Sequence, residues 1–131
     1  MSLFSNWERG GVMRVVASTL GFAAVALGAF GAHALKPTLT ALATMEIWQT
    51  ASFYHLIHAV LLVCIALARP TARFCFWFFV VGILLFSGSL YLFALTGIKV
   101  IAVAAPVGGF FLLSGWIFLA LHRGGEADAR T

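Results

Sequence analysis

The amino-acid sequence predicts an all-α integral membrane protein, an up-down bundle of four membrane-spanning helices with both the N and C termini in the cytoplasm. Of the 131 residues, 63% are hydrophobic and 9% are charged, against about 45–50% and about 25% in soluble domains. Residues 15–35, 47–68, 74–98 and 100–122 contain no Asp, Glu, Lys or Arg. These runs are 21, 22, 25 and 23 residues long, and about 20 apolar residues cross a bilayer. A soluble monomer is therefore excluded.

The basic residues predict the orientation. Lys36 and Lys99 lie in the first and third connections, whereas the other six of the eight lie before the first run, in the second connection or after the fourth run. Those six are Arg9, Arg14, Arg69, Arg73, Arg123 and Arg130. An excess of Lys and Arg marks the cytoplasmic side of a membrane protein. We therefore expect a multi-pass protein of the inner (cytoplasmic) membrane, in contact with the lipid bilayer and with no nucleic-acid partner.

The first spanning helix is expected over residues 14–35. It should stop before Lys36-Pro37, because proline disfavours helical geometry in the residue before it. The run is longer than the roughly 7 to 15 apolar residues of a signal peptide, so we interpret it as a retained helix. Residues 1–13 are expected either to lie at the membrane interface or to be disordered. Residues 36–46 carry Leu39, Leu42 and Met45 three apart, which fits a short surface helix as well as an unstructured loop.

The other three helices are expected over residues 46–68, 74–95 and 98–121. Thr44 is a candidate N-cap for the second helix, and Thr96-Gly97 suits a tight turn with Gly97 in a left-handed conformation. Pro106 lies inside the fourth helix and should bend it. Short connections make sequential helices antiparallel neighbours, which gives the up-down bundle. The tail over residues 123–131 is expected to be mobile.

The first helix carries a stripe of small residues at spacings of four, three, four and three. These are Ala17, Gly21, Ala24, Gly28 and Gly31. In lipid, helices associate through close approach at small residues. The stripe therefore predicts that this helix lies at the centre of the packing, within the chain or against another subunit. The fourth helix repeats the pattern less regularly, with Gly108 and Gly115 as its packing residues.

Polar residues inside the spans form the candidate site. His55 and His58 lie three apart on one face of the second helix, and Ser87, Ser89 and Tyr91 on the third helix fall at a similar depth. We call these five residues the polar layer. His55 should be buried, neutral and bonded to Ser87 or Ser89, of which one should face inward. His58 should find fewer partners and need water or a ligand.

Charged and thiol side chains lie nearer the membrane surfaces. His33, Lys36, Glu46 and Lys99 are expected to form an ion cluster at the outer face, where an exposed ion pair contributes little stability. Cys64 and Cys75 should stay reduced near the cytoplasmic face and act as packing residues. Two histidines without a Cys, Asp or Glu at matching depth make an incomplete metal or haem site, so no metal and no cofactor are expected.

These residues are compatible with two functions. The first is a non-enzymatic membrane protein that acts by helix packing, homo-oligomerisation, or association with lipid or a larger membrane complex. The spans contain no Asp, Glu or Lys, and the sequence has no nucleophile elbow or phosphate loop, so catalysis is not expected. The alternative is a binding or transport site for a quinone, a lipid or a proton-linked solute around His55 and His58.

Four groups of residues in order carry a resemblance to a known family. They are GAFGAHAL at residues 28–35, WQTA at 48–51 with Tyr54, His55 and His58, FSGSLY at 86–91, and PVGG at 106–109 with GW at 115–116. The chain resembles the YgdD-type family of small four-helix membrane proteins, whose vertebrate relatives include the transmembrane protein 256-like proteins. The resemblance implies a four-span protein of the bacterial inner membrane or of an organelle. It implies no activity, because the function of that family is unknown.

Overall fold

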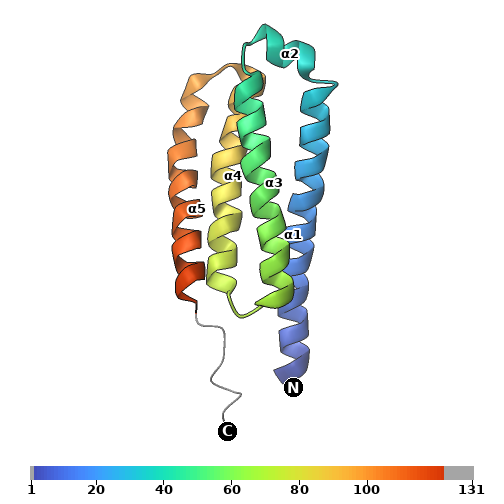
Figure 1. The fold of residues 1–131 in the computed structure, drawn as a ribbon, viewed down its shortest axis with the longest axis vertical. Coiled ribbons are helices and arrows are strands. Elements are labelled where there is room, and N and C mark those ends of the chain that lie inside the picture. Colours follow the sequence, from blue (N-terminus) through green and yellow to red (C-terminus); the bar gives the residue numbers. More distant parts are fainter. Residues whose placement is uncertain (1, 123–131) are drawn as a thin grey trace.

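The computed structural model describes the backbone of residues 2–122 and the side chains of residues 10–122. Within these residues the chain forms helices and no strands. The elements are α1 (Ser2–Ala32), α2 (Lys36–Ala41), α3 (Met45–Ala68), α4 (Arg73–Thr96), the 3-10 helix η1 (Lys99–Val103) and α5 (Ala104–Leu121). The four long helices run side by side, and α2 lies across one end (Figure 1). The predicted all-α membrane bundle is confirmed.

Four helical segments are long and apolar enough to cross a membrane. They are Gly10–Ala32, Met45–Ala68, Arg73–Thr96 and Lys99–Leu121. The start of α1 and the end of α5 lie at the same end of the bundle, away from α2 (Figure 1), as up-down topology requires. We call this the arginine end, since Arg69 and Arg73 flank the connection between α3 and α4 there. That this end faces the cytoplasm stays a prediction.

The first helix is longer than the sequence indicates. It begins at Ser2 and ends at Ala32, so the head expected at the interface or in disorder continues the first span as helix. A turn over residues 33–35 follows, in which the Leu35 N–H donates to the Phe30 carbonyl at 2.8 Å. The connection then forms the short helix α2, with Pro37 in its first turn, where a missing N–H costs little. The tail expected to be mobile, residues 123–131, lies outside the described residues.

The turn between α4 and the fourth span has two features. Gly97 caps α4 with φ 71°, and its N–H donates to the Phe93 carbonyl at 2.8 Å, in the left-handed geometry that glycine adopts without strain. The fourth span begins as η1, and its α-helix starts at Ala104. Pro106 therefore lies in the first turn of α5, where backbone N–H groups lack intrahelical partners. Pro106 thus lies at the start of an α-helix rather than inside one, and the bend expected there stays a prediction.

The packing order differs from the prediction that the first helix is central. α3 packs on α1 and α4, and α4 packs on α3 and α5, so α1 and α5 are the outer helices (Figure 1). On α1, Ala17 and Ala24 are buried, and a Cβ at Gly31 would collide with the indole of Trp48. A Cβ at Gly21 or Gly28 would meet nothing within 4 Å. The small-residue stripe is therefore only partly used inside the chain.

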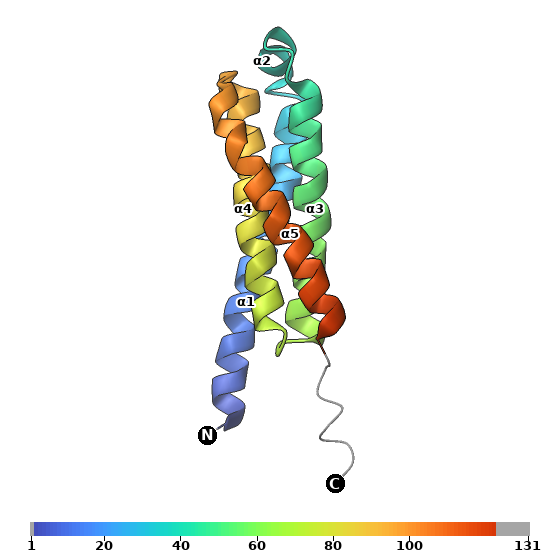
Figure 2. The same cartoon turned by 90° about the vertical axis from the view of Figure 1, so that its left-hand side faces the viewer.

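The closest approach of two helix backbones joins α4 and α5. A Cβ at Gly108 would lie 2.7 Å from the Cα of Phe86, and one at Gly115 would lie 2.9 Å from the ring of Phe79. Gly82 on α4 contributes from the other side, because a Cβ there would lie 2.8 Å from Cγ of Leu112. Figure 2 shows α5 crossing α4 at an angle. Glycine is required at this crossing because the neighbouring groups occupy the space of a side chain.

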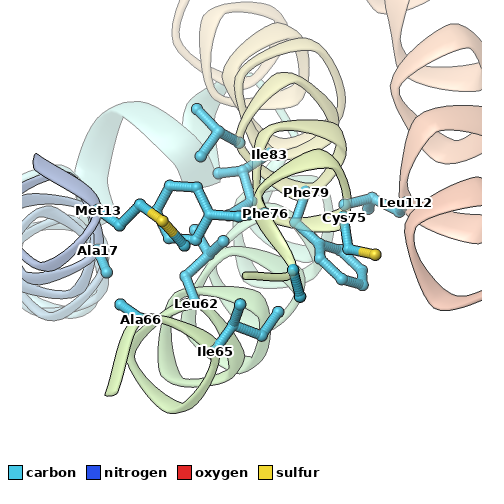
Figure 3. Packing of buried hydrophobic residues seen from close by; sticks show 12 residues of the cluster. Met13, Ala17, Leu62, Ile65, Ala66, Cys75, Phe76, Phe79, Ile83 and Leu112 are labelled. Carbon is cyan, nitrogen blue, oxygen red and sulfur yellow. The ribbon is translucent and has the colours of Figure 1, made fainter. Parts of the chain in front are cut away.

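Two apolar clusters fill the interior. One occupies the half toward the arginine end and joins α1, α3, α4 and α5, with Met13 lying against Phe76 and with Leu112 supplied by α5 (Figure 3). The other lies toward α2 and includes Leu39 and Trp48. Between them along α3 and α4 lies the polar layer, which divides the core into two halves.

Candidate functional site

The polar layer is built by the two central helices. All five of its side chains are buried, with exposed fractions between 1% for Ser87 and 8% for Tyr91. His55 and His58 come from α3, and the other three come from α4. The polar atoms of these residues must therefore find partners inside the protein, because neither water nor lipid hydrocarbon supplies them there.

His55 is hydrogen-bonded across to α4. Its Nδ1 lies 3.2 Å from the hydroxyl of Tyr91, and that hydroxyl donates to Oγ of Ser52 at 3.4 Å. The second ring nitrogen, Nε2, is buried and has no hydrogen-bond partner among the described residues. The backbone of Leu20 on α1 lies near the ring. His55 therefore keeps one unused hydrogen-bonding position.

The partner of His55 differs from the serines that the sequence predicts. Side chains lean toward the N-terminus of their helix, and α3 and α4 are antiparallel, so His55 and Tyr91 lean toward each other. Ser87 is short and instead donates to the carbonyl of Ala51 on α3 at 2.9 Å. Matching residues by depth alone misses this lean and the greater reach of tyrosine.

Both serines are buried, although the sequence predicts that one faces inward. α4 has neighbours on two sides, α3 and α5, so opposite faces of the helix are covered. The Ser89 hydroxyl donates to the carbonyl of Phe86 in its own helix at 3.0 Å, a local bond typical of serine in helices. Ser89 thus contributes no bond between helices.

His58 has the partners that it was expected to lack. Its Nδ1–H donates to the Tyr54 carbonyl at 2.7 Å, and its Nε2 accepts from the indole N–H of Trp116 on α5 at 3.2 Å. Both ring nitrogens of a neutral imidazole are therefore used. His58 ties α3 to α5, and it needs neither water nor ligand.

Three further residues form hydrogen bonds between helices near the polar layer. None of them was predicted to belong to the site. The indole N–H of Trp48 donates to the Leu27 carbonyl on α1 at 3.1 Å, an approach that the bare backbone of Gly31 permits. Trp116 bonds to His58 as described. Thr44 lies at the N-cap of α3, as expected, but its hydroxyl donates to the Ala94 carbonyl of α4 at 2.7 Å rather than capping the helix. A buried indole N–H needs an acceptor, and this is the signal in the sequence for Trp48, whereas Trp116 is 45% exposed.

The residues of the expected outer-face ion cluster lie apart from this site. His33, Lys36, Glu46 and Lys99 are all exposed near the α2 end, and within residues 10–122 none of them makes an ion pair. Cys64 is exposed and Cys75 is buried, and both are free thiols. No three His, Cys, Asp or Glu side chains of the described residues are placed to hold a metal ion.

A groove opens between α3 and α5 toward the arginine end. It has a volume of about 440 Å³. Its walls are apolar side chains of both helices, Trp116 lies on the wall from α5, and Arg69 lies at its α3 end. The groove lies beyond the polar layer, because its α3 wall begins at Leu61 and runs away from His58.

Comparisons with known proteins place the chain beside membrane proteins of unknown function. A family profile described as "Protein of unknown function (DUF423)" matches residues 27–109. The UPF0382 inner membrane protein YgdD of Escherichia coli is 40% identical over 112 residues, covering 82% of this chain and 85% of that protein. The UPF0382 membrane protein SSP2132 of Staphylococcus saprophyticus is 37% identical over 102 residues, covering 75% and 84%. No solved structure matches the chain. These relatives and the four apolar helices confirm a multi-pass membrane protein and agree with an inner-membrane location.

Proposed function

The chain belongs to the DUF423 family of proteins of unknown function, and from this premise we propose that it is a non-enzymatic membrane protein that assembles inside the bilayer. The assembly surface is the side of α1 next to its contact with α3, made by Gly21, Val25 and Gly28, and the partner is a second copy of the chain. This proposal keeps the coarse description that the relatives support, a membrane protein, and adds a surface and a partner.

The unused part of the small-residue stripe carries the proposal. Gly21 and Gly28 lie seven residues apart, so they share one face of α1, and a Cβ at either would meet nothing within 4 Å. Val25, between them, is 65% exposed. Small residues that repeat every seven positions let two membrane helices cross closely at about 20°. The same helix already uses Ala17, Ala24 and Gly31 against α3, so its remaining small face is free for another helix.

The polar layer supports a non-enzymatic role. His58 uses both ring nitrogens on groups of the same chain, and the Ser87 hydroxyl binds a backbone carbonyl. Groups engaged in this way hold helices in register, whereas a general acid or base must reach a substrate proton. This favours packing over catalysis.

The test compares two Gly→Leu variants in detergent micelles and in lipid nanodiscs. Gly28→Leu blocks the proposed face, and Gly88→Leu is its matched control, because a Cβ at Gly88 on α4 also meets nothing within 4 Å. We expect native mass spectrometry and crosslinking to show a dimer for the wild type and for Gly88→Leu, and a monomer for Gly28→Leu. A monomeric wild type, or equal loss of the dimer in both variants, would contradict the proposal.

A small-molecule site at His55 is the second candidate function. One observation favours it, the buried Nε2 without a hydrogen-bond partner, which a ligand donor or acceptor could use. Mass spectrometry of protein purified from membranes should then detect a bound organic molecule that is absent from His55→Leu. The same molecule on both proteins, or none on the wild type, would count against this site.

A further inference from the structure

The groove between α3 and α5 has one polar end and an apolar body. Leu61, Cys64 and Ala68 line it from α3, and Trp116 and Ala120 line it from α5. From residue 61 to residue 68 an α-helix rises about 10 Å. At the end of the groove nearest the polar layer, the indole N–H of Trp116 donates to Nε2 of His58, which joins the two helices there. The body therefore offers an apolar channel that runs lengthwise along the helices.

The shallow end carries a cation that no carboxylate of the described side chains neutralises. Arg69 is exposed and follows the last residue of α3. Its guanidinium donates to the carbonyl of His122 at 3.5 Å, a long contact that leaves most of its N–H groups unused. Within residues 10–122 the one acidic residue is Glu46, at the opposite end of α3.

The surroundings of Arg69 are polar and positively charged. The hydroxyl of Thr71 lies 3.3 Å from Nε2 of His122, and Arg73 begins α4 a few residues further along. A span boundary with two arginines is the level at which phospholipid headgroups lie. Arginine binds phosphate in a bidentate manner, so the end of the groove suits a phosphate oxygen pair.

We propose that the groove is a binding site for an anionic phospholipid, with one acyl chain between α3 and α5 and the headgroup phosphate on Arg69. An apolar channel that ends in a guanidinium complements a molecule with a hydrocarbon chain joined to a phosphate. A free phosphate would leave the apolar body unfilled, and a zwitterionic lipid has no net charge to balance Arg69. This site is separate from the α1 face proposed for assembly, and it holds whether or not the chain dimerises.

The first experiment titrates the full chain in detergent with phosphatidylglycerol or phosphatidylethanolamine of identical acyl chains, read by native mass spectrometry. We expect phosphatidylglycerol to bind more tightly, and Arg69→Gln to weaken it roughly tenfold, the value of a charge-assisted hydrogen bond. Arg73→Gln is the matched control, because it removes one positive charge at the same end without touching the groove. Equal binding of the two lipids, or equal losses in the two variants, would overturn the proposal.

A second experiment uses the wild-type protein and so does not depend on the folding of a variant. Cys64 lines the groove and is exposed, whereas the other cysteine, Cys75, is buried. We expect phosphatidylglycerol to slow alkylation of Cys64 by N-ethylmaleimide several-fold relative to phosphatidylethanolamine. Glycerol 3-phosphate, which has the phosphate but no acyl chain, should leave the rate unchanged. A rate unaffected by phosphatidylglycerol, or slowed equally by glycerol 3-phosphate, would refute a lipid in the groove.

Discussion

Adding one methyl group at Gly108 should destabilise the protein, whereas adding it at the next residue should not. A Cβ at Gly108 would lie 2.7 Å from Cα of Phe86 and 2.8 Å from the carbonyl carbon of Leu85. Both are backbone atoms, so relief requires a shift of α5 away from α4 rather than a side-chain rotation. A Cβ at Gly109 would lie 3.8 Å from the ring of Phe86, which is an ordinary van der Waals contact.

The magnitudes follow from these two distances. Overpacking typically costs about 1–3 kcal/mol, and Gly→Ala inside a helix contributes about 0.5–1 kcal/mol of stability. Gly108→Ala should therefore lower the free energy of unfolding by roughly 1–2 kcal/mol, and Gly109→Ala should leave it equal or raise it slightly. Because the helix-propensity gain is common to both variants, the predicted difference between them is about 1–3 kcal/mol.

The assay is reversible unfolding in mixed detergent micelles, followed by circular dichroism and by the fluorescence of the tryptophans. Both variants change the same residue type on the same helix, so their unfolded states are closely alike. If Gly108→Ala is as stable as Gly109→Ala, the close crossing of α4 and α5 is not the packing that holds the outer helix.

Other substitutions test the hydrogen bonds and the orientation. Trp116→Phe leaves Nε2 of His58 without its donor, and we expect a loss of about 1–3 kcal/mol in the same unfolding assay. Trp77→Phe on α4 is the control matched in exposure, with 41% of the side chain exposed against 45% for Trp116, and it should cost less. Tyr91→Phe should cost a similar amount. A double-mutant cycle of Tyr91→Phe with His55→Leu should show a coupling energy of about 0.5–3 kcal/mol. Strictly additive losses would disprove the hydrogen bond between Nδ1 of His55 and the Tyr91 hydroxyl. In a variant without native cysteines, Thr40→Cys should react with an impermeant maleimide in intact cells and Thr71→Cys only after the membrane is opened. The reverse pattern would place the arginine end outside.

The spans and their turns could be predicted because the bilayer leaves few choices. Each spanning segment must satisfy its backbone internally and cover the hydrocarbon, so the uncharged runs locate the helices to within a few residues. Gly97 was predictable for the same kind of reason, since a left-handed residue at the end of α4 favours glycine. Such signals depend on local backbone geometry and on the apolar bilayer, and both leave a recognisable pattern in the sequence.

The order of packing could not be predicted from the same information. A stripe of small residues records that a helix can be approached closely, but not what approaches it. On α1 the stripe divides, with Gly31 against Trp48 and Gly28 against open space. On α5 the less regular set, Gly108 and Gly115, meets α4 along its length. The stripes of α1 and α5 differ in the side chain or backbone that lies opposite each glycine, and those groups belong to another helix.

The two histidines show the same limit at the level of single atoms. Each lies on α3 four residues after a carbonyl that its ring could use, Tyr54 for His58 and Ala51 for His55. His58 takes the Tyr54 carbonyl, but the Ala51 carbonyl already accepts the hydroxyl of Ser87 from α4. The ring of His55 bonds instead to Tyr91, and its Nε2 is left without a partner. A serine on the neighbouring helix thus makes two residues that look equivalent in the sequence differ in hydrogen bonding. Under the second proposed function, His55 rather than the deeper His58 is therefore the residue that would bind a ligand atom.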